Sequence, residues 1–337
     1  MSESRNKQFA HLIHMPPAMV PYVNLFVNEQ ELDLVLGLAD QTLTQNQVAD
    51  MMNIGLAEAQ HLLKKLIQWE IITYSNSGDE TTYAVGRFYF TFDYWTAFET
   101  GSWGRVPKWR RNAATEWVMQ EFIKLHTPSF EKIEKDPDTW VRMKNRDVLL
   151  LDEALDLMDA SEVICVLPCA CKALLRPASP IIEGSMRVGA RAKETLEIGQ
   201  GRGLTPEEAK RHLLIMDRMG LVHTGPKFWR EHDPSLEWVS HGNCNIAYSF
   251  PFRAGFRLGL HKKYPRVHYV AQFDSERCIS CGTCIGRCPF GALYHDGATI
   301  VLHGETRRKI TFDADQCYGC GLCATSCPQS AVTMQPL

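Results

Sequence analysis

The sequence predicts an α+β chain with three successive regions. A capped helix pair followed by a hairpin pattern lies between residues 30 and 86, and a mostly helical, aromatic-rich pattern begins at residue 88. A cysteine-rich segment with two matching halves then closes the chain. We therefore expect three domains, at residues 1–87, 88–268 and 269–337.

The first region has the order of elements of a winged helix. Thr44 and Gln47 are spaced as a capping box that starts a helix over 45–52, and a second helix is expected from Leu56 to about Trp69. Two strands within residues 71–85 would form the wing. The N-terminal end of the second helix carries few basic or amide side chains that could read bases, so we expect packing or partner docking here, not DNA binding.

The cysteine-rich segment contains the pattern C-x2-C-x2-C-x3-C-P twice, from Cys278 to Pro289 and from Cys317 to Pro328. Bacterial-type ferredoxins hold two [4Fe–4S] clusters with this pattern, and the fourth cysteine of each repeat ligates the other repeat's cluster. A zinc ribbon would need only four of these thiolates. We therefore predict a 2[4Fe–4S] ferredoxin-like domain. Its expected ligands are Cys278, Cys281, Cys284 and Cys327 for cluster 1, and Cys317, Cys320, Cys323 and Cys288 for cluster 2.

Glycines inside the repeats suit this geometry. Gly282, Gly319 and Gly321 lack a Cβ, so the backbone can turn and approach other atoms closely there. We expect these three positions to shape the two ligand loops.

The middle region combines helical patterns with a short buried strand at residues 162–167, which leads into a turn containing cysteines. Thr205, Pro206 and Glu208 predict a capped helix start, followed by a strand near Leu221. The tryptophans between residues 88 and 150, such as Trp103 and Trp109, are expected in the core or at an interface.

Four cysteines remain outside the two repeats: Cys165, Cys169, Cys171 and Cys244. On an extended strand Cys169 and Cys171 would share one face, and Cys244 lies in a polar loop. Three interpretations stay open for these four residues: a third iron–sulfur cluster, a zinc site, or ordinary buried thiols.

The composition of the chain argues against several classes of protein. The 337 residues carry a net charge of −3 and 45% hydrophobic residues, which is ordinary for a soluble protein and too balanced for binding nucleic acid by charge alone. No apolar run is long enough to span a membrane, and no signal peptide is recognisable. Twelve cysteines, most of them assigned to clusters, favour a reducing cytoplasm. The chain also lacks a dinucleotide or phosphate-binding motif.

The order of these features resembles a family of winged-helix-containing 4Fe-4S dicluster proteins of anaerobic bacteria. The shared features are the Pro168-Cys169-Ala170-Cys171 turn, the helix opened by Leu204-Thr205, the Gly220-Leu221-Val222-His223 segment and the Cys244-Asn245 loop. Related sequences have more cysteines around the turn and the loop than this chain has. The resemblance implies electron transfer in anaerobic metabolism.

From the residues we expect a non-catalytic electron-transfer subunit that relays electrons to or from a larger oxidoreductase with a flavin, molybdenum, tungsten or nickel centre. A soluble ferredoxin is another expected electron donor. The alternative is a redox-sensing transcription regulator with a winged helix. A cationic stretch at helical spacing before the cysteine repeats would steer an acidic partner. It consists of Arg253, Arg257, His261, Lys262, Lys263 and Arg266.

Overall fold

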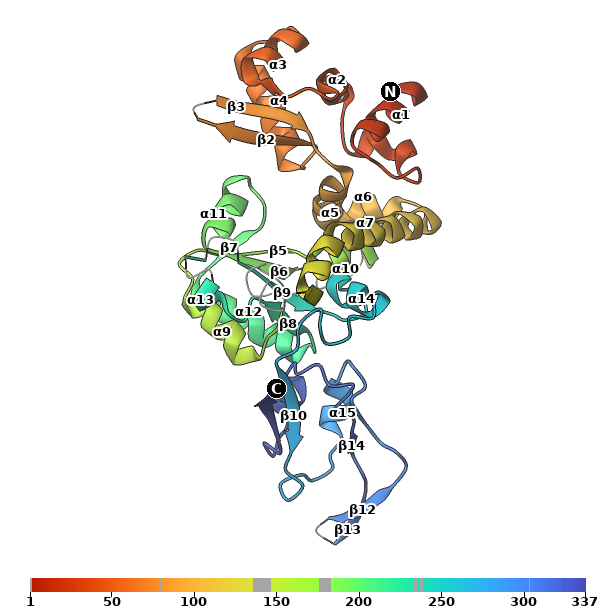
Figure 1. The fold of residues 1–337 in the computed structure, drawn as a ribbon, viewed down its shortest axis with the longest axis vertical. Coiled ribbons are helices and arrows are strands. Elements are labelled where there is room, and N and C mark those ends of the chain that lie inside the picture. Colours follow the sequence, from red (N-terminus) through yellow and green to blue (C-terminus); the bar gives the residue numbers. More distant parts are fainter. Residues whose placement is uncertain are drawn as a thin grey trace. The chain divides into compact units, whose positions relative to one another are not determined.

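A computed structural model of the chain describes residues 2–78, 80–135, 147–175, 183–232, 235–236, 239–302 and 304–337. The chain divides into two compact units, one formed by residues 1–125 and 168–182, the other by 126–167 and 183–337. Figure 1 labels their helices and strands. No helix in the described part of the chain is both long and apolar enough to cross a membrane.

The first unit combines helices with a small three-stranded sheet of order β1-β3-β2. Its helical elements are α1 (Glu3–Leu12), a 3-10 segment (Val20–Leu25), α2 (Glu29–Leu38), α3 (Gln45–Met52), α4 (Leu56–Gln68), α5 (Phe88–Phe98), α6 (Thr100–Arg105), α10 (Ala170–Leu175) and the beginning of α7 (Lys108–Lys135). Its strands are β1 (Leu43–Thr44), β2 (Ile72–Ser77) and β3 (Glu80–Val85).

The helix boundaries predicted for residues 45–69 are confirmed. Thr44 and Gln47 form the predicted capping box, in which each residue's side chain accepts a hydrogen bond from the other's backbone N–H. Asn53 ends α3 in the left-handed conformation at φ 52°. The two strands of the hairpin pair antiparallel with Tyr74 opposite Tyr83.

The aromatic residues after position 88 form part of the core of this unit. Trp103 is fully buried, and its indole N–H donates to the carbonyl of Leu174 at 3.1 Å. Phe88 and Phe92 stack with ring centres 5.2 Å apart. Trp109, by contrast, is 63% exposed, so the predicted core role holds for Trp103 and not for Trp109.

The second unit contains a six-stranded sheet of order β4-β8-β9-β6-β5-β7. The strands of this sheet are β4 (Asp147–Val148), β5 (Ile164–Pro168), β6 (Glu183–Val188), β7 (Arg202–Leu204), β8 (Val222–Gly225) and β9 (Ser240–Cys244). The helices of this part are α9 (Leu151–Asp159), α11 (Gly189–Glu197), α12 (Pro206–Arg218), α13 (Trp229–His232) and α14 (Phe250–Arg257). The sequence predicted β5 and β8, and it missed the other four strands.

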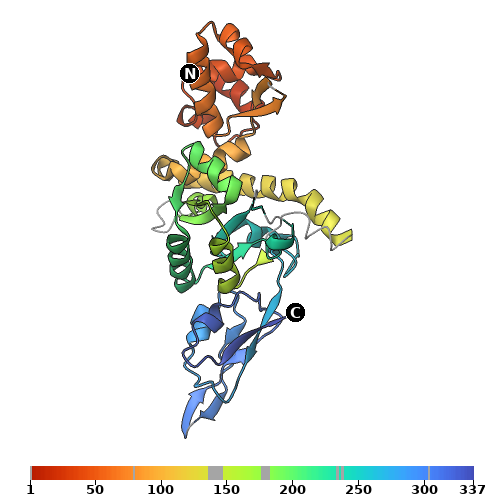
Figure 2. The same ribbon diagram turned by 90° about the vertical axis from the view of Figure 1, so that its left-hand side faces the viewer.

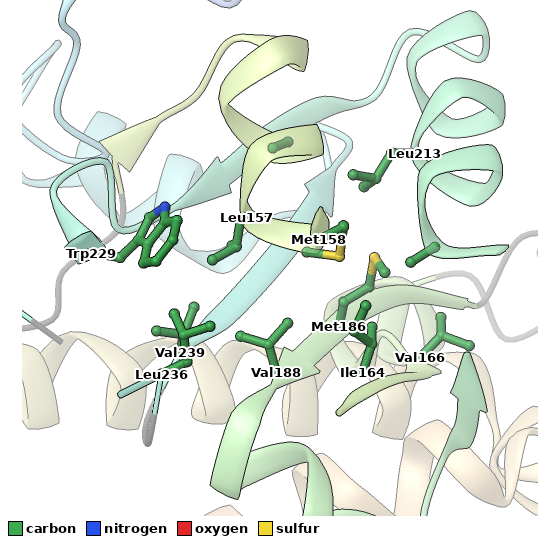
Figure 3. Packing of buried hydrophobic residues seen from close by; sticks show 12 residues of the cluster. Leu157, Met158, Ile164, Val166, Met186, Val188, Leu213, Trp229, Leu236 and Val239 are labelled. Carbon is green, nitrogen blue, oxygen red and sulfur yellow. The ribbon is translucent and has the colours of Figure 1, made fainter. Parts of the chain in front are cut away.

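Alternation along β5 creates two apolar layers. Ile164 and Val166 point to the face covered by α9 and α12, where they pack with Met158 and Leu213 (Figure 3). Cys165 points to the opposite face and packs with Ala192 of α11. The predicted cap of α12 is confirmed, with Thr205 and Glu208 in a capping box and Pro206 in the first turn.

The C-terminal part of this unit is built from short paired strands and two short helices, drawn in blue in Figure 2. β10 (Tyr269–Phe273) pairs antiparallel with β15 (Val332–Pro336), and β11 (Leu293–Tyr294) pairs with β14 (Thr311–Phe312). β12 (Thr299–Leu302) and β13 (Glu305–Arg308) form a hairpin. The two helices are α15 (Thr283–Arg287) and α16 (Leu322–Thr325).

A buried histidine on the six-stranded sheet makes the stability of this unit depend on pH. His223 on β8 is 1% exposed, and its Nδ1 lies 2.9 Å from Oδ1 of Asn243 on β9. Burial lowers the pKa of His223 to about 4. The folded state therefore binds fewer protons than the unfolded state between pH 4 and 6.5, so stability rises with pH across that window and is lost as the pH falls.

We expect the wild-type chain to lose about 2 kcal/mol of unfolding free energy through this residue between pH 7 and pH 5. His223→Gln should reduce that pH dependence, measured by urea unfolding at both pH values. His61→Gln is the matched control, because His61 is exposed on α4. Identical pH slopes for the wild type and His223→Gln would contradict the prediction.

Candidate metal centre

The two cysteine repeats fold into matching loops. In each loop a glycine in the left-handed conformation precedes the short helix that carries the third cysteine: Gly282 (φ 77°) before α15 and Gly321 (φ 76°) before α16. An aspartate stabilises the approach to each loop. Asp274 accepts from the backbone N–H of Glu276 at 2.9 Å, and Asp313 accepts from that of Asp315 at 2.9 Å. The sequence duplication is therefore also a structural one.

The thiol of Cys284 lies among three other thiols. Burial, which is the largest cause, and the neighbouring thiols of Cys278, Cys281 and Cys327 together raise its pKa to about 11. Cys327 belongs to the second repeat, so this group contains three cysteines of one repeat and one of the other. These are the four residues predicted to hold cluster 1.

A second group of four thiols lines a small cavity. Cys288, Cys317, Cys320 and Cys323 are all in its wall. Burial, together with the neighbouring thiols of Cys317 and Cys288, raises the pKa of Cys323 to about 12. Burial also strongly raises the pKa of Cys320. The rest of the wall is mainly apolar and includes Phe290, Leu293, Phe312, Tyr318, Leu322 and Met334.

This donor set fits an iron–sulfur cluster. Cys320 and Cys323, whose pKa values burial raises, need a strong positive partner before they ionise, and iron supplies it. A cubane takes one thiolate at each of its four irons, so its ligands surround a larger space than the ligands of one ion. Among the residues that the structure describes, no three His, Cys, Asp or Glu side chains converge on a site for one metal ion.

Backbone N–H groups point at several of the sulfurs. Ser280 donates to Sγ of Cys278 at 3.4 Å, and Gly319 donates to Sγ of Cys317 at the same distance. Ala331 donates to Sγ of Cys327 at 3.2 Å. Such donors favour the thiolate form and tune the potential of a bound cluster.

The two groups differ in their exposure. Cys281 of the first repeat is exposed, and a hydrogen bond from Thr283 lowers its pKa. Cys317 and Cys323 of the second repeat are buried. Cys320 packs against the apolar cluster that contains Val148, Val222, Phe252 and Leu322. The first group thus lies nearer to solvent.

Gly319 shows how closely the backbone approaches at the second repeat. Its φ is 60°, and an added Cβ would lie 2.2 Å from the carbonyl oxygen of Tyr269 on β10. The prediction that this glycine permits a close approach is confirmed. The matching position in the first repeat is Ser280, which adopts the same left-handed conformation at φ 52°.

Two of the other four cysteines, Cys171 and Cys244, occupy places that the sequence did not predict correctly. Cys171 lies on α10, which begins at Ala170, so the expectation that it shares a strand face with Cys169 is wrong. Cys244 ends β9 and did not fold into a loop. There its Sγ lies 3.3 Å from Oγ1 of Thr224.

The structure does not bring Cys165 and Cys244 together. Cys165 lies beside Arg187, which pairs with Ser240 on β9. Cys244 is four residues further along that strand, a rise of about 13 Å. Cys169 and Cys171 belong to the other unit. A third metal site that uses all four cysteines stays a prediction, which the iron content will test.

Two sets of residues that the sequence did not single out surround the second group. Tyr318 stacks on Phe290 with ring centres 4.2 Å apart. Asp217 at the end of α12 accepts from Nη2 of Arg287 at 3.3 Å and from the hydroxyl of Thr325 at 3.1 Å. Arg287 precedes Cys288, so this contact fixes the fourth cysteine of the first repeat. In the sequence, the only signal for any of these residues is that Tyr318 and Phe290 lie next to or near cluster ligands in the chain.

These features define an iron–sulfur domain with duplicated ligand loops. Residues 271–334 match the family model described as a 4Fe-4S dicluster domain. A comparison of the chain with curated proteins finds no match. The C-terminal part of the chain is therefore a ferredoxin-like iron–sulfur domain, and the remaining residues lie outside this match.

Proposed function

We propose that the chain is an electron-transfer subunit that relays single electrons through two [4Fe–4S] clusters to or from a larger catalytic oxidoreductase. Cys278, Cys281, Cys284 and Cys327 would hold cluster 1, and Cys317, Cys320, Cys323 and Cys288 would hold cluster 2. The observation that carries this proposal is the cavity whose wall contains all four cysteines of the second set. When bound, the clusters supply reversible one-electron chemistry.

The two sets of thiols lie close together and differ in their exposure to solvent. Cys284 contributes to the raised pKa of Cys323, which supports two neighbouring sets of thiols. Two cysteines of the second set, Cys317 and Cys323, are buried, whereas the first set is open at Cys281. This asymmetry supports a short relay with one exposed end.

The partner in this proposal is a larger oxidoreductase with a flavin, molybdenum, tungsten or nickel centre, with a soluble ferredoxin as an alternative donor. The N-terminal module would serve for docking. Its helix–helix–hairpin order also suits the alternative of a winged-helix redox regulator that binds DNA. Residues 28–86 contain nine Asp and Glu against two Lys, however, and such a module repels phosphates.

Anaerobic purification followed by iron and sulfide analysis tests the proposal. We expect about eight irons and eight sulfides per chain, and a reduced cubane signal by EPR after dithionite treatment. About twelve irons would support a third cluster at the remaining cysteines. Four irons or fewer without an EPR signal would contradict the proposal, and a redox-dependent gel shift on DNA would favour the regulator.

A further inference from the structure

An exposed patch at the end of α14 combines apolar and cationic side chains. We call it the α14 face and define it by Arg253, Phe256, Arg257, Leu258 and Lys263. Phe256 is 46% exposed and Leu258 40% exposed. The turn after the helix folds back against it, because the carbonyl oxygen of Tyr264 would lie 2.0 Å from a Cβ on Gly255. This contact places Lys263 beside the helix end.

Aromatic contacts connect this face to the second group of cysteines. The ring of Phe256 packs edge-on against Tyr318 at 5.9 Å. Tyr318 lies between Cys317 and Cys320 in the chain and lines the cavity with them. Phe256 is therefore an exposed side chain one contact removed from a residue of the ligand loop.

Only Arg253 and Arg257 of the predicted cationic stretch lie on a helix, because α14 ends at Arg257. His261 and Lys262 bind the second repeat instead. Nε2 of His261 lies 2.9 Å from the carbonyl oxygen of Asp315, its Nδ1 lies 2.8 Å from the hydroxyl of Tyr318, and Nζ of Lys262 donates to the carbonyl of Ala314 at 2.7 Å. These contacts hold the α14 face against the cysteine loop.

The charge of this region has one sign. Residues 250–267 contain five Lys and Arg and no Asp or Glu. The adjacent turn of the second repeat brings Asp315 next to this region, because His261 and Lys262 contact the backbone carbonyls of Asp315 and Ala314. An apolar centre with a cationic rim favours a partner with an acidic rim, because complementary charge speeds encounter and orients docking.

We propose that the α14 face is the docking surface for an acidic electron-transfer protein, which exchanges electrons with the second cluster beside Tyr318 and Phe256. This inference rests on the proposed function. In each transfer one electron leaves the reduced cluster and reduces the partner's acceptor by one electron, with no bond formed or broken.

Stopped-flow oxidation of the dithionite-reduced holoprotein tests the proposal. The probes are an acidic flavodoxin, the trianion tris(oxalato)cobaltate(III) and the trication hexaamminecobalt(III). The variant Arg257→Glu/Lys263→Glu is compared with Arg308→Glu/Lys309→Glu, which makes the same charge change at exposed residues near the first repeat. The pair Arg257→Gln/Lys263→Gln replaces the first variant if that one does not fold.

At low ionic strength we expect the α14 variant to react about tenfold more slowly with the flavodoxin and the trianion, and faster with the trication. The difference should shrink in 0.5 M salt because screening shortens the range of the charges. With the flavodoxin, the Arg308→Glu/Lys309→Glu control should stay within twofold of the wild type.

An equal or larger effect of the control variant would overturn the proposal in favour of exchange at the first repeat. If the α14 variant reacts at unchanged rates, and if the wild type is a dimer that these substitutions dissociate, the face is a contact between two copies of this chain. Both results leave the proposed function intact as long as iron content and reduction are normal. Loss of iron in the wild type would instead refute the proposed function.

Discussion

Gly319→Ala should remove the second cluster and leave the first. The new Cβ would lie 2.2 Å from the carbonyl oxygen of Tyr269 and 2.8 Å from its carbonyl carbon, which are backbone atoms of β10 and cannot swing away. Alanine at φ 60° adds the cost of the left-handed conformation. Together these effects should destabilise the loop by about 2–4 kcal/mol and displace the neighbouring Cys317 and Cys320.

The matched control is Ser280→Ala, which places alanine at the same position of the first repeat. Ser280 already carries a Cβ at φ 52°, and its hydroxyl donates to the carbonyl of Arg308. This change should cost only about 1 kcal/mol for the lost hydrogen bond. Iron analysis should give about four irons for Gly319→Ala and about eight for Ser280→Ala. Equal iron contents would show that the close approach to β10 is unimportant.

The parts of the fold that were predictable from sequence are those with local signals. Thr44 and Thr205 mark helix starts because their hydroxyls accept backbone N–H groups within the same turn. β9 has no such signal: its Ser, His, Gly and Asn residues have low strand propensity, and tertiary packing buries three of them. Cys171 was expected in a turn after β5, and nothing local marks the start of α10 at Ala170.

The candidate site follows the same rule. The spacing of the eight cysteines is a local pattern, so the ligand loops could be predicted. The contact of Asp217 with Arg287 joins residues 70 positions apart, and the ring of Phe256 meets Tyr318 across a similar distance in the chain. Tertiary packing creates both contacts, and no periodicity in the sequence encodes them.

The fourth cysteine of each repeat should ligate the cluster held by the other repeat. Cys288 belongs to the first repeat, but it lines the cavity with Cys317, Cys320 and Cys323 of the second. Cys327 belongs to the second repeat, but it raises the pKa of Cys284 in the first. If the fourth cysteines are exchanged between the repeats in this way, removing Cys288 should abolish cluster 2. Cluster 1 should remain, although Cys288 belongs to the repeat that supplies three ligands of cluster 1.

Double variants make this test decisive. Cys288→Ser/Cys320→Ser removes two ligands of the same proposed cluster and should retain about four irons with one EPR signal. Cys288→Ser/Cys284→Ser removes one ligand from each cluster and should retain almost none. If each repeat instead held its own cluster, the two results would be reversed. The comparison is matched because both variants replace two buried or partly buried cysteines by serine and share Cys288→Ser.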